Sequence, residues 1–352
     1  MVPLLEIRDL RKDYVVRSRR AGGTARTIHA VAGVSFSVDA GETLGLVGES
    51  GCGKSTLART LLFLEAPTAG DIVFEGQRIG EREAVRLRRR AQIVFQDPYA
   101  SLPPRMRIGR IIAEPLLIHR IVRRADVEDR VAGLLRDVGL KPSLARALPH
   151  ELSGGQRQRV GIARALAVQP SLLIADEAVS SLDVSVQAQI LNLLRDLQER
   201  HGLAYLFISH DLGVVTYMSH RVAVMYLGKI VELVATADLR RRALHPYTRS
   251  LLSAVPTLRG PNGGRVRLAG EPPDPAMPPA GCAFHPRCPI ARPVCGERTP
   301  GLDEWLPGRR AACHFALVED DGTTSDTVGG RAGQRVTVRG GEATLETGGL
   351  DA

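Results

Sequence analysis

The stretch Gly48-Glu49-Ser50-Gly51-Cys52-Gly53-Lys54-Ser55 decides the fold of this chain of 352 residues. It follows an apolar run at residues 43–47 and precedes a segment of helical periodicity at residues 54–64. The pattern is typical of a phosphate-binding loop, because its glycines let backbone N–H groups surround a phosphate at a helix N-terminus. The sequence therefore predicts an α/β fold of the P-loop NTPase type that binds a nucleoside triphosphate.

Two residues of this stretch carry specific chemistry. The ammonium of Lys54 can reach the β- and γ-phosphates, and the hydroxyl of Ser55 can bind Mg²⁺. The other candidates for nucleotide binding here are Gly48, Ser50, Gly51, Gly53 and Thr56.

A pair of acids supplies the second half of the predicted site. Asp176 and Glu177 follow the apolar run Leu172-Leu173-Ile174-Ala175. Asp176 is suited to a Mg²⁺ contact, and Glu177 can polarise the attacking water as general base. Two acids after an apolar strand also occur as simple surface caps, but a phosphate loop in the same chain favours the catalytic interpretation.

The rest of the chain divides by composition. Residues 1–245 alternate β-branched runs with helical segments, which indicates a mostly parallel sheet flanked by helices. A proline-rich connector at 269–281 leads into a small module rich in cysteine, and residues 319–352 have little to bury, so we predict a disordered tail. The predicted strands are 4–10, 43–47, 92–95, 171–175, 204–209 and 221–226, and the predicted helices 54–64, 125–138, 156–167 and 184–200.

Charge and hydropathy narrow the classes of function. The net charge is +9, and the arginine runs 88–90 and 240–242 have no interleaved aromatic residues, so solvated surface arginines are favoured over a nucleic-acid surface. No apolar run approaches the roughly 20 residues of a membrane-spanning helix, and charge interrupts the N-terminal apolar residues at once. The sequence predicts a cytosolic protein that meets a membrane only through partners.

Further motifs make the prediction specific. Leu152-Ser153-Gly154-Gly155-Gln156 resembles the signature motif of the ABC (ATP-binding cassette) ATPases. The other motifs of that family occur in its usual order: Tyr14 as the aromatic residue that stacks on adenine, Gln96 as the Q-loop glutamine, Ser180-Ser181-Leu182-Asp183 as the D-loop and His210 as the switch histidine.

The resemblance implies a RecA-like core with an antiparallel β subdomain and a helical subdomain at about residues 97–153. It also implies a dimer in which two cassettes sandwich two ATP molecules with Mg²⁺. Residues expected to act on the chain's own nucleotide are Lys54, Ser55, Gln96, Asp176, Glu177 and His210; those expected at the partner's nucleotide are Ser153, Gly154 and Gly155. Gln156 and Asp183 are further candidates for nucleotide binding. Ala178-Val179 departs from the Pro-Thr that is frequent after the catalytic Glu, which leaves coupling between subunits less certain.

The C-terminal part points to one branch of the family. A single cassette without long heptad segments favours transport. His245-Pro246-Tyr247-Thr248 and the later cysteines resemble the peptide/nickel import ATPases, which implies a second domain at 246–318. Implied partners are a second ABC subunit (a paralogue or the same chain), two membrane permease subunits and, indirectly, an extracytoplasmic solute-binding protein, with the chain at the cytoplasmic face of the membrane. The alternative is a soluble ABC ATPase of DNA repair or chromosome metabolism with a zinc module.

Four of the five cysteines lie close together in the sequence, at Cys282, Cys288, Cys295 and Cys313. In a cytosolic protein such a group indicates metal or redox chemistry more than disulfides. The spacing lacks the paired knuckles of a zinc ribbon, and the resemblance to peptide importers favours a [4Fe–4S] cluster. Zinc and free structural thiols remain as alternatives.

Overall fold

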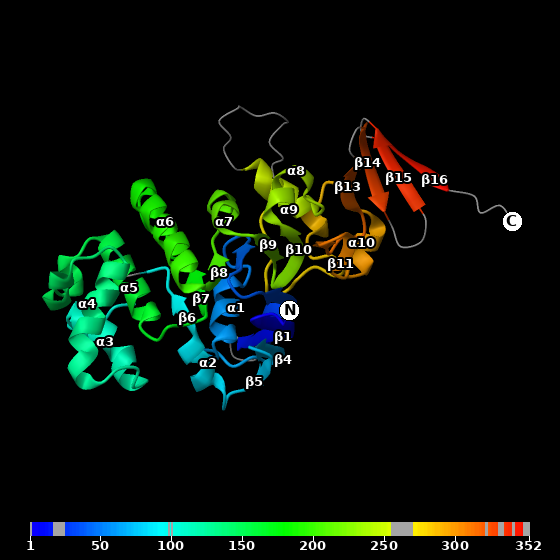
Figure 1. The fold of residues 1–352 in the computed structure, drawn as a ribbon. Coiled ribbons are helices and arrows are strands. Elements are labelled where there is room, and N and C mark those ends of the chain that lie inside the picture. The colour runs from blue at the N-terminus through cyan, green and yellow to red at the C-terminus, as the bar shows by residue number, and fades with distance from the viewer. Residues whose placement is uncertain are drawn as a thin grey trace. The chain divides into compact units, whose positions relative to one another are not determined.

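The structure of this chain is a computed structural model, shown in Figure 1, that describes residues 2–16, 25–97, 99, 101–254, 270–320, 323–329, 334–339 and 342–347. The chain forms two compact units. The first comprises Met1–Lys12, Ser35–Gly45 and Ser55–His210, and the second Asp13–Val34, Leu46–Lys54 and Asp211–Ala352. The domain boundary at residue 245 stays a prediction.

An antiparallel sheet begins the chain, as the family resemblance implied. Its strand order is β2-β1-β4-β5, formed by β1 (Leu5–Val16), β2 (Arg26–Val38), β4 (Ala69–Phe74) and β5 (Gln77–Ile79). In β1, Leu5 and Ile7 are buried and lie opposite Phe74 and Ile72 of β4. The apolar pattern predicts only the first half of β1, because the exposed second half lacks this alternation.

Parallel strands bring the acids to one edge of the first unit. Their order is β3-β8-β7-β6, formed by β3 (Thr43–Val47), β8 (Ala204–Ile208), β7 (Leu172–Asp176) and β6 (Ala91–Val94). β7 and β8 are buried throughout, and Asp176 lies in register with Ile208. Asp176 therefore ends its strand at the carboxyl edge of the sheet, where α/β proteins bind their ligands.

Helices complete the first unit. They are α1 (Lys54–Leu61), α2 (Ala84–Arg90), α3 (Ile108–Ile118), α4 (Val127–Asp137), α5 (Gly154–Leu166) and α6 (Val184–His201), with short 3-10 turns at Arg124–Asp126, Pro142–Arg146 and Pro149–Glu151. Of these, α1, α4, α5 and α6 lie within a few residues of predicted helices, whereas α2 and α3 are not among the predicted ones. α3, α4 and α5 pack on one another, at the left in Figure 1. The described part of residues 97–153 contains helices and turns without a strand.

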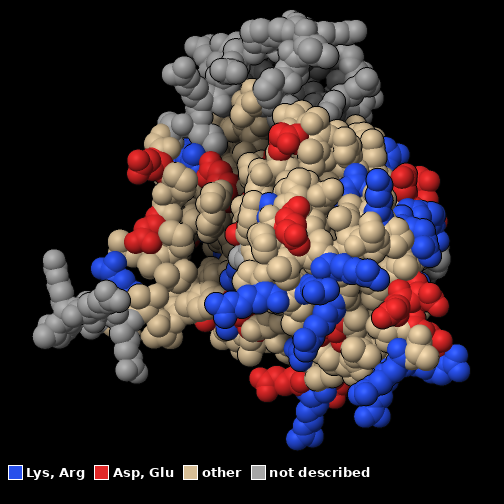
Figure 2. Space-filling view, turned by 90° about the vertical axis from the view of Figure 1, so that its left-hand side faces the viewer, with Lys and Arg blue, Asp and Glu red and all other residues tan. Residues whose placement is uncertain are grey.

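The surface that carries α3 and α4 has mixed charge. Figure 2 shows basic side chains interspersed with acidic ones on this face. One such pair is Arg123 with Asp126, at 2.7 Å between Nε and Oδ2. The mixture fits solvated arginines better than a basic surface for nucleic acid.

In the second unit, strands of the C-terminal module extend the sheet formed by β9 (Arg221–Tyr226) and β10 (Lys229–Ala235). The strands run in the order β11-β12-β10-β9-β3, with β11 (Asp303–Leu306) and β12 (Arg309–Ala311). β12 pairs with β10, with Ala311 opposite Glu232. The composition of the chain changes near residue 245. It gives no sign that β12, far along the chain, covers the edge of β10. The helical elements are α7 (Leu212–Met218), α8 (Thr236–Arg242), α9 (Pro246–Ser253), a 3-10 turn at His285–Arg287 and α10 (Pro293–Glu297).

The C-terminal residues differ from the predicted disordered tail. The structure has an antiparallel sheet of β13 (Ala316–Asp320), β14 (Thr323–Gly329), β15 (Gln334–Arg339) and β16 (Glu342–Thr347). Valines alternate with polar residues in β15, QRVTVR, a pattern that favours strands even where composition is polar. Among the described residues, no helix combines the length and apolarity that crossing a membrane requires.

Candidate functional site

The phosphate loop is shaped by backbone that approaches it closely. A Cβ atom at Gly48 would lie 2.2 Å from the carbonyl oxygen of Met225, and one at Gly53 would lie 2.0 Å from that of Ala30. Gly51 and Gly53 also have φ values of +77° and +107°, which favour glycine. The glycines predicted from the motif are thus required by close approach and by backbone conformation.

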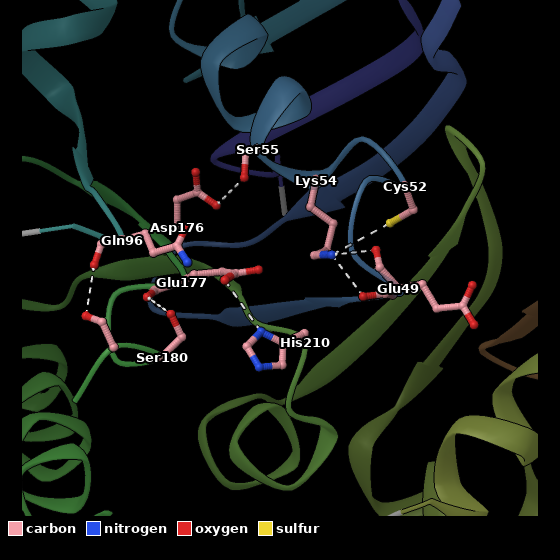
Figure 3. A network of polar contacts seen from close by, with 11 residues as sticks. Glu49, Cys52, Lys54, Ser55, Gln96, Asp176, Glu177, Ser180 and His210 are labelled. Carbon is pink, nitrogen blue, oxygen red and sulfur yellow. Dashed lines mark hydrogen bonds and ion pairs between the residues drawn. The ribbon is translucent and has the colours of Figure 1, made fainter. Parts of the chain in front are cut away.

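Lys54 is held inside this loop. Its side chain is buried and donates hydrogen bonds to the carbonyl oxygens of Gly48 and Glu49, each at 2.9 Å (Figure 3). Cys52 is also buried, and burial raises the pKa of its thiol although Lys54 opposes the shift. Lys54 is therefore pre-positioned by loop carbonyls, and the Cys52 thiol is a protonated packing group at neutral pH.

Ser55 and Asp176, the two residues predicted to bind Mg²⁺, contact one another directly. Ser55 lies in the first turn of α1, and its Oγ donates to Oδ1 of Asp176 at 3.0 Å (Figure 3). Asp176 is 4% exposed. A hydroxyl and a buried carboxylate at this distance are the oxygen ligands that Mg²⁺ prefers, so these two residues fit the ion that the fold implies.

Glu177 and His210 face one another. Oε2 of Glu177 lies 3.5 Å from Nδ1 of His210 (Figure 3). The backbone of Glu177 has a φ of +49°, which is uncommon for a residue with a side chain. Its N–H donates to the carbonyl of Ile208 at 3.0 Å, and its carbonyl accepts from the Oγ of Ser180 at 3.0 Å. A conformation fixed from both sides is characteristic of functional positions.

The signature segment and the D-loop lie together at the starts of two helices. Oγ of Ser153 accepts from the N–H of Gln156 at 3.3 Å, and Oε1 of Gln156 accepts from the N–H of Ser153 at 3.0 Å, which makes a capping box. The carboxylate of Asp183 accepts from the N–H of Val186 at 2.9 Å, and this bond lowers the pKa of Asp183. A Cβ at Gly155 would lie 2.5 Å from Cγ1 of Val186, so the glycine lets α5 and α6 approach.

The other predicted site residues have simpler surroundings. Gln96 is exposed, and its backbone carbonyl accepts from Oγ of Ser181 at 3.3 Å (Figure 3). Tyr14 is half-buried on β1, and Thr56 accepts at its carbonyl from Thr60 within α1. Ser50 is exposed. A Cβ atom added at Gly154 would lie 3.6 Å from a methyl group of Leu182, an ordinary contact distance.

The structure also reveals contacts that the motifs do not predict. Tyr247 accepts a hydrogen bond at Oη from the N–H of Glu49 at 2.9 Å. Arg287 forms an ion pair with the Glu49 carboxylate at 2.9 Å. The sequence singles out Tyr247 through the family-like His-Pro-Tyr-Thr stretch, but Arg287 has no sequence signal because the loop carrying it is matched by no chemical pattern.

The four cysteines of the C-terminal module do not form a metal site in the structure. Cys295 is buried and the others are half-buried, and burial raises the pKa of Cys288 to about 11 and that of Cys313 to about 12. Within the part of the chain that the structure describes, no three Cys, His, Asp or Glu side chains are grouped so that they could hold a metal ion. The predicted [4Fe–4S] cluster and the zinc alternative are therefore not supported by this geometry.

Comparison with known proteins assigns the family. Residues 31–180 match the ABC transporter family model, and residues 231–295 match the model of the oligopeptide/dipeptide transporter, C-terminal region. The oligopeptide transport ATP-binding protein AppF of Bacillus subtilis is 51% identical over 319 residues, which are 89% of this chain and 97% of AppF. The chain belongs to the ABC transporter ATP-binding proteins.

A second sequence relative and a solved structure agree with this assignment of the chain as an ABC ATPase. The di/tripeptide transport ATP-binding protein DppF of Pseudomonas aeruginosa is 48% identical, covering 90% of this chain and 98% of DppF. Among solved structures, the dimeric cassette MJ0796 bound to ADP and Pi has a TM-score of 0.58 and 26% identity, covering 66% of this chain and 98% of that one. The alternative of a soluble ATPase of DNA metabolism finds no support in these relatives.

A buried histidine beside the site gives a prediction for pH dependence. His245 begins α9, and its Nδ1 accepts from the N–H of Tyr247 at 3.1 Å. Burial lowers the pKa of His245 to about 3 from 6.5, so below pH 6.5 the unfolded chain binds a proton that the folded chain does not. We expect the free energy of unfolding to fall by up to about 1.4 kcal/mol per pH unit from this group as the pH drops below 6.5.

Urea unfolding of the wild type and of His245→Asn between pH 7.5 and 5 measures this effect. Asn keeps an acceptor for the N–H of Tyr247 but does not titrate, so its stability should depend less on pH. The exposed His201→Asn is the control and should follow the wild type. Equal pH dependence of the wild type and His245→Asn would contradict the prediction.

Proposed function

We propose that this ABC ATPase powers an importer that takes up peptides, together with a second cassette and two membrane permease subunits at the cytoplasmic face of the membrane. The observation that carries the proposal is the pairing of Ser55 with Asp176 and of Glu177 with His210 in a chain that also has the oligopeptide/dipeptide C-terminal region. The names of the relatives AppF and DppF support peptides as the solute. An extracytoplasmic binding protein would deliver the peptide.

Each half of the site has a role in hydrolysis. Lys54 and the loop N–H groups bind the phosphates, while Ser55, Asp176 and Gln96 would hold Mg²⁺, which neutralises charge on the phosphate oxygens. Glu177 accepts a proton from the attacking water, and His210 orients Glu177 and the terminal phosphate. Backbone restraint at Glu177 fixes the base before the substrate binds, which lowers the cost of reorganisation.

The signature segment acts on the nucleotide of the partner cassette. Ser153 is exposed at the start of α5, where the helix dipole and unpaired N–H groups favour an anion. The close approach of Gly155 to Val186 places the signature segment against the start of α6, next to the D-loop. A second copy of the chain or a paralogue would complete the site.

Replacement of the base tests the proposed hydrolysis. Glu177→Gln removes the proton acceptor but keeps the shape, so ATP binding should stay unchanged while turnover falls by about 10²–10⁴-fold. Turnover is measured in the assembled transporter and binding by equilibrium titration. Glu199→Gln, at an exposed position on α6, is the control and should keep full turnover. Full turnover by Glu177→Gln would contradict the assignment of the base.

A groove in the first unit is suited to the permease. It has a volume of about 350 Å³, and its lining includes residues of α2, β6 and α3, among them the apolar residues Leu64, Val85 and Ile118. Val85 is 61% exposed and Ile118 is 68% exposed. Exposed apolar residues in a groove that also has two arginines and a glutamate fit an amphipathic helix, and we assign a cytoplasmic helix of the permease to it.

A charge in the groove should prevent assembly. Ile118→Glu is expected to reduce co-purification with the permease by about tenfold or more, because a carboxylate would be buried without a partner. The isolated variant should still bind ATP, since Ile118 is exposed. Val2→Glu, at a position 77% exposed outside the groove, should assemble normally. Normal assembly of Ile118→Glu would show that the permease docks elsewhere.

The cofactor of the cysteine module is a separate proposal, that the four thiols hold a [4Fe–4S] cluster when the protein is made anaerobically. It is supported by the resemblance to peptide importers and by the nearness of the other three thiols to Cys313, whose pKa is raised first by burial and further by Cys288, Cys282 and Cys295. Iron, acid-labile sulfide and zinc per chain are the measurement. About four irons and four sulfides are expected; one zinc without sulfide would indicate the alternative site, and absence of all three would show free thiols.

A further inference from the structure

The phosphate loop is held from outside by the C-terminal region at a single residue, Glu49. Nη1 and Nη2 of Arg287 donate to the two carboxylate oxygens of Glu49 at 2.9 and 3.1 Å. The N–H of Glu49 donates to Oη of Tyr247 at 2.9 Å. The side chain of Arg287 is only 6% exposed and that of Glu49 is 22% exposed, so this bidentate pair is largely removed from water and from screening by salt.

Arg287 is held in position by a short turn and a cluster of packed aromatic rings. It ends the 3-10 turn His285–Arg287, whose neighbour Phe284 is buried. The ring of Phe284 packs on those of Tyr226 and Tyr247, with centroids at 5.4 and 5.3 Å. Nη1 of Arg287 also donates to Oη of Tyr226 at 3.4 Å. The aromatic cluster that contacts Arg287 therefore includes the same tyrosine that binds the backbone of Glu49.

Glu49, which Arg287 and Tyr247 hold in place, in turn contacts the phosphate-binding lysine. Its carbonyl accepts from Nζ of Lys54 at 2.9 Å and from the N–H of Cys52 at 3.3 Å. Glu49 also places a carboxylate in the loop that must receive the negative triphosphate. Without a cation beside it, this carboxylate would weaken nucleotide binding by repulsion.

We propose that Arg287 is a positioning residue of the ATP site, which neutralises Glu49 and fixes the phosphate loop for the nucleotide. Arg287 lies in the stretch matched by the oligopeptide/dipeptide C-terminal model and outside the stretch matched by the ABC transporter model. The C-terminal module is thus a working part of the nucleotide site. Through the pair of Arg287 with Glu49, the module strengthens the binding of ATP.

Affinity for ATP in four variants of the full chain tests this proposal. Arg287→Ala leaves the Glu49 carboxylate unpaired and should weaken ATP binding about tenfold, equivalent to about 1.4 kcal/mol. The double variant Glu49→Gln with Arg287→Ala removes the repelling charge as well, and should bind ATP more tightly than Arg287→Ala alone. Arg287→Lys keeps the charge without the bidentate pair and should lie between the wild type and Arg287→Ala. Arg310→Ala, at an exposed position of the same module, should bind as the wild type does.

Thermal melting of each variant separates this role from a general loss of structure. In the assembled transporter, the KM for ATP should rise in Arg287→Ala while kcat changes little, which a merely structural defect would not produce. Wild-type affinity of Arg287→Ala, or a double variant weaker than Arg287→Ala, would overturn the proposal. If Arg287→Ala does not fold, wild-type affinity of Arg287→Lys would overturn it equally.

Discussion

The close approach of backbone to the phosphate loop is the constraint on which the site depends. Carbonyl oxygens of Met225 and Ala30 lie where side chains at Gly48 and Gly53 would be, so only glycine permits the loop to sit against β9 and β2. In the loop so formed, Lys54 donates hydrogen bonds to the carbonyl oxygens of Gly48 and Glu49. The fold itself therefore holds the loop and its lysine in shape.

The same principle governs the acidic part of the site. Asp176 ends a buried strand, and Glu177 follows it in a left-handed conformation fixed by Ile208 and Ser180. A carboxylate carried by a backbone that hydrogen bonds hold in place needs little reorganisation when ATP and water arrive. The structure thereby separates two tasks, a metal position beside Ser55 and a base position beside His210.

The sequence predicts the chemical groups of this site better than the distant contacts that hold them in place. The loop, the acids and the signature follow from local motifs, and the predicted bounds of α5 and α6 agree because capping residues Ser153 and Asp183 mark the helix starts. Strand β12 pairing with β10 could not be predicted, because pairing of distant edges leaves no local pattern. Arg287 was missed for the same reason: its partner Glu49 lies 238 residues away. The cysteines differ from both cases: their proximity in the sequence suggests a metal site, but the geometry of the described residues gives no support for one, so the cluster stays a prediction.

A solved structure of the Glu177→Gln chain with ATP and Mg²⁺ is the most direct test of this account. It should show a dimer with the triphosphate wrapped by residues 48–54, Mg²⁺ bound by Ser55 with Asp176 beside it, and Ser153 of the second cassette at the terminal phosphate. Mg²⁺ bound away from Ser55 and Asp176, or a nucleotide site completed without the signature segment, would contradict the account.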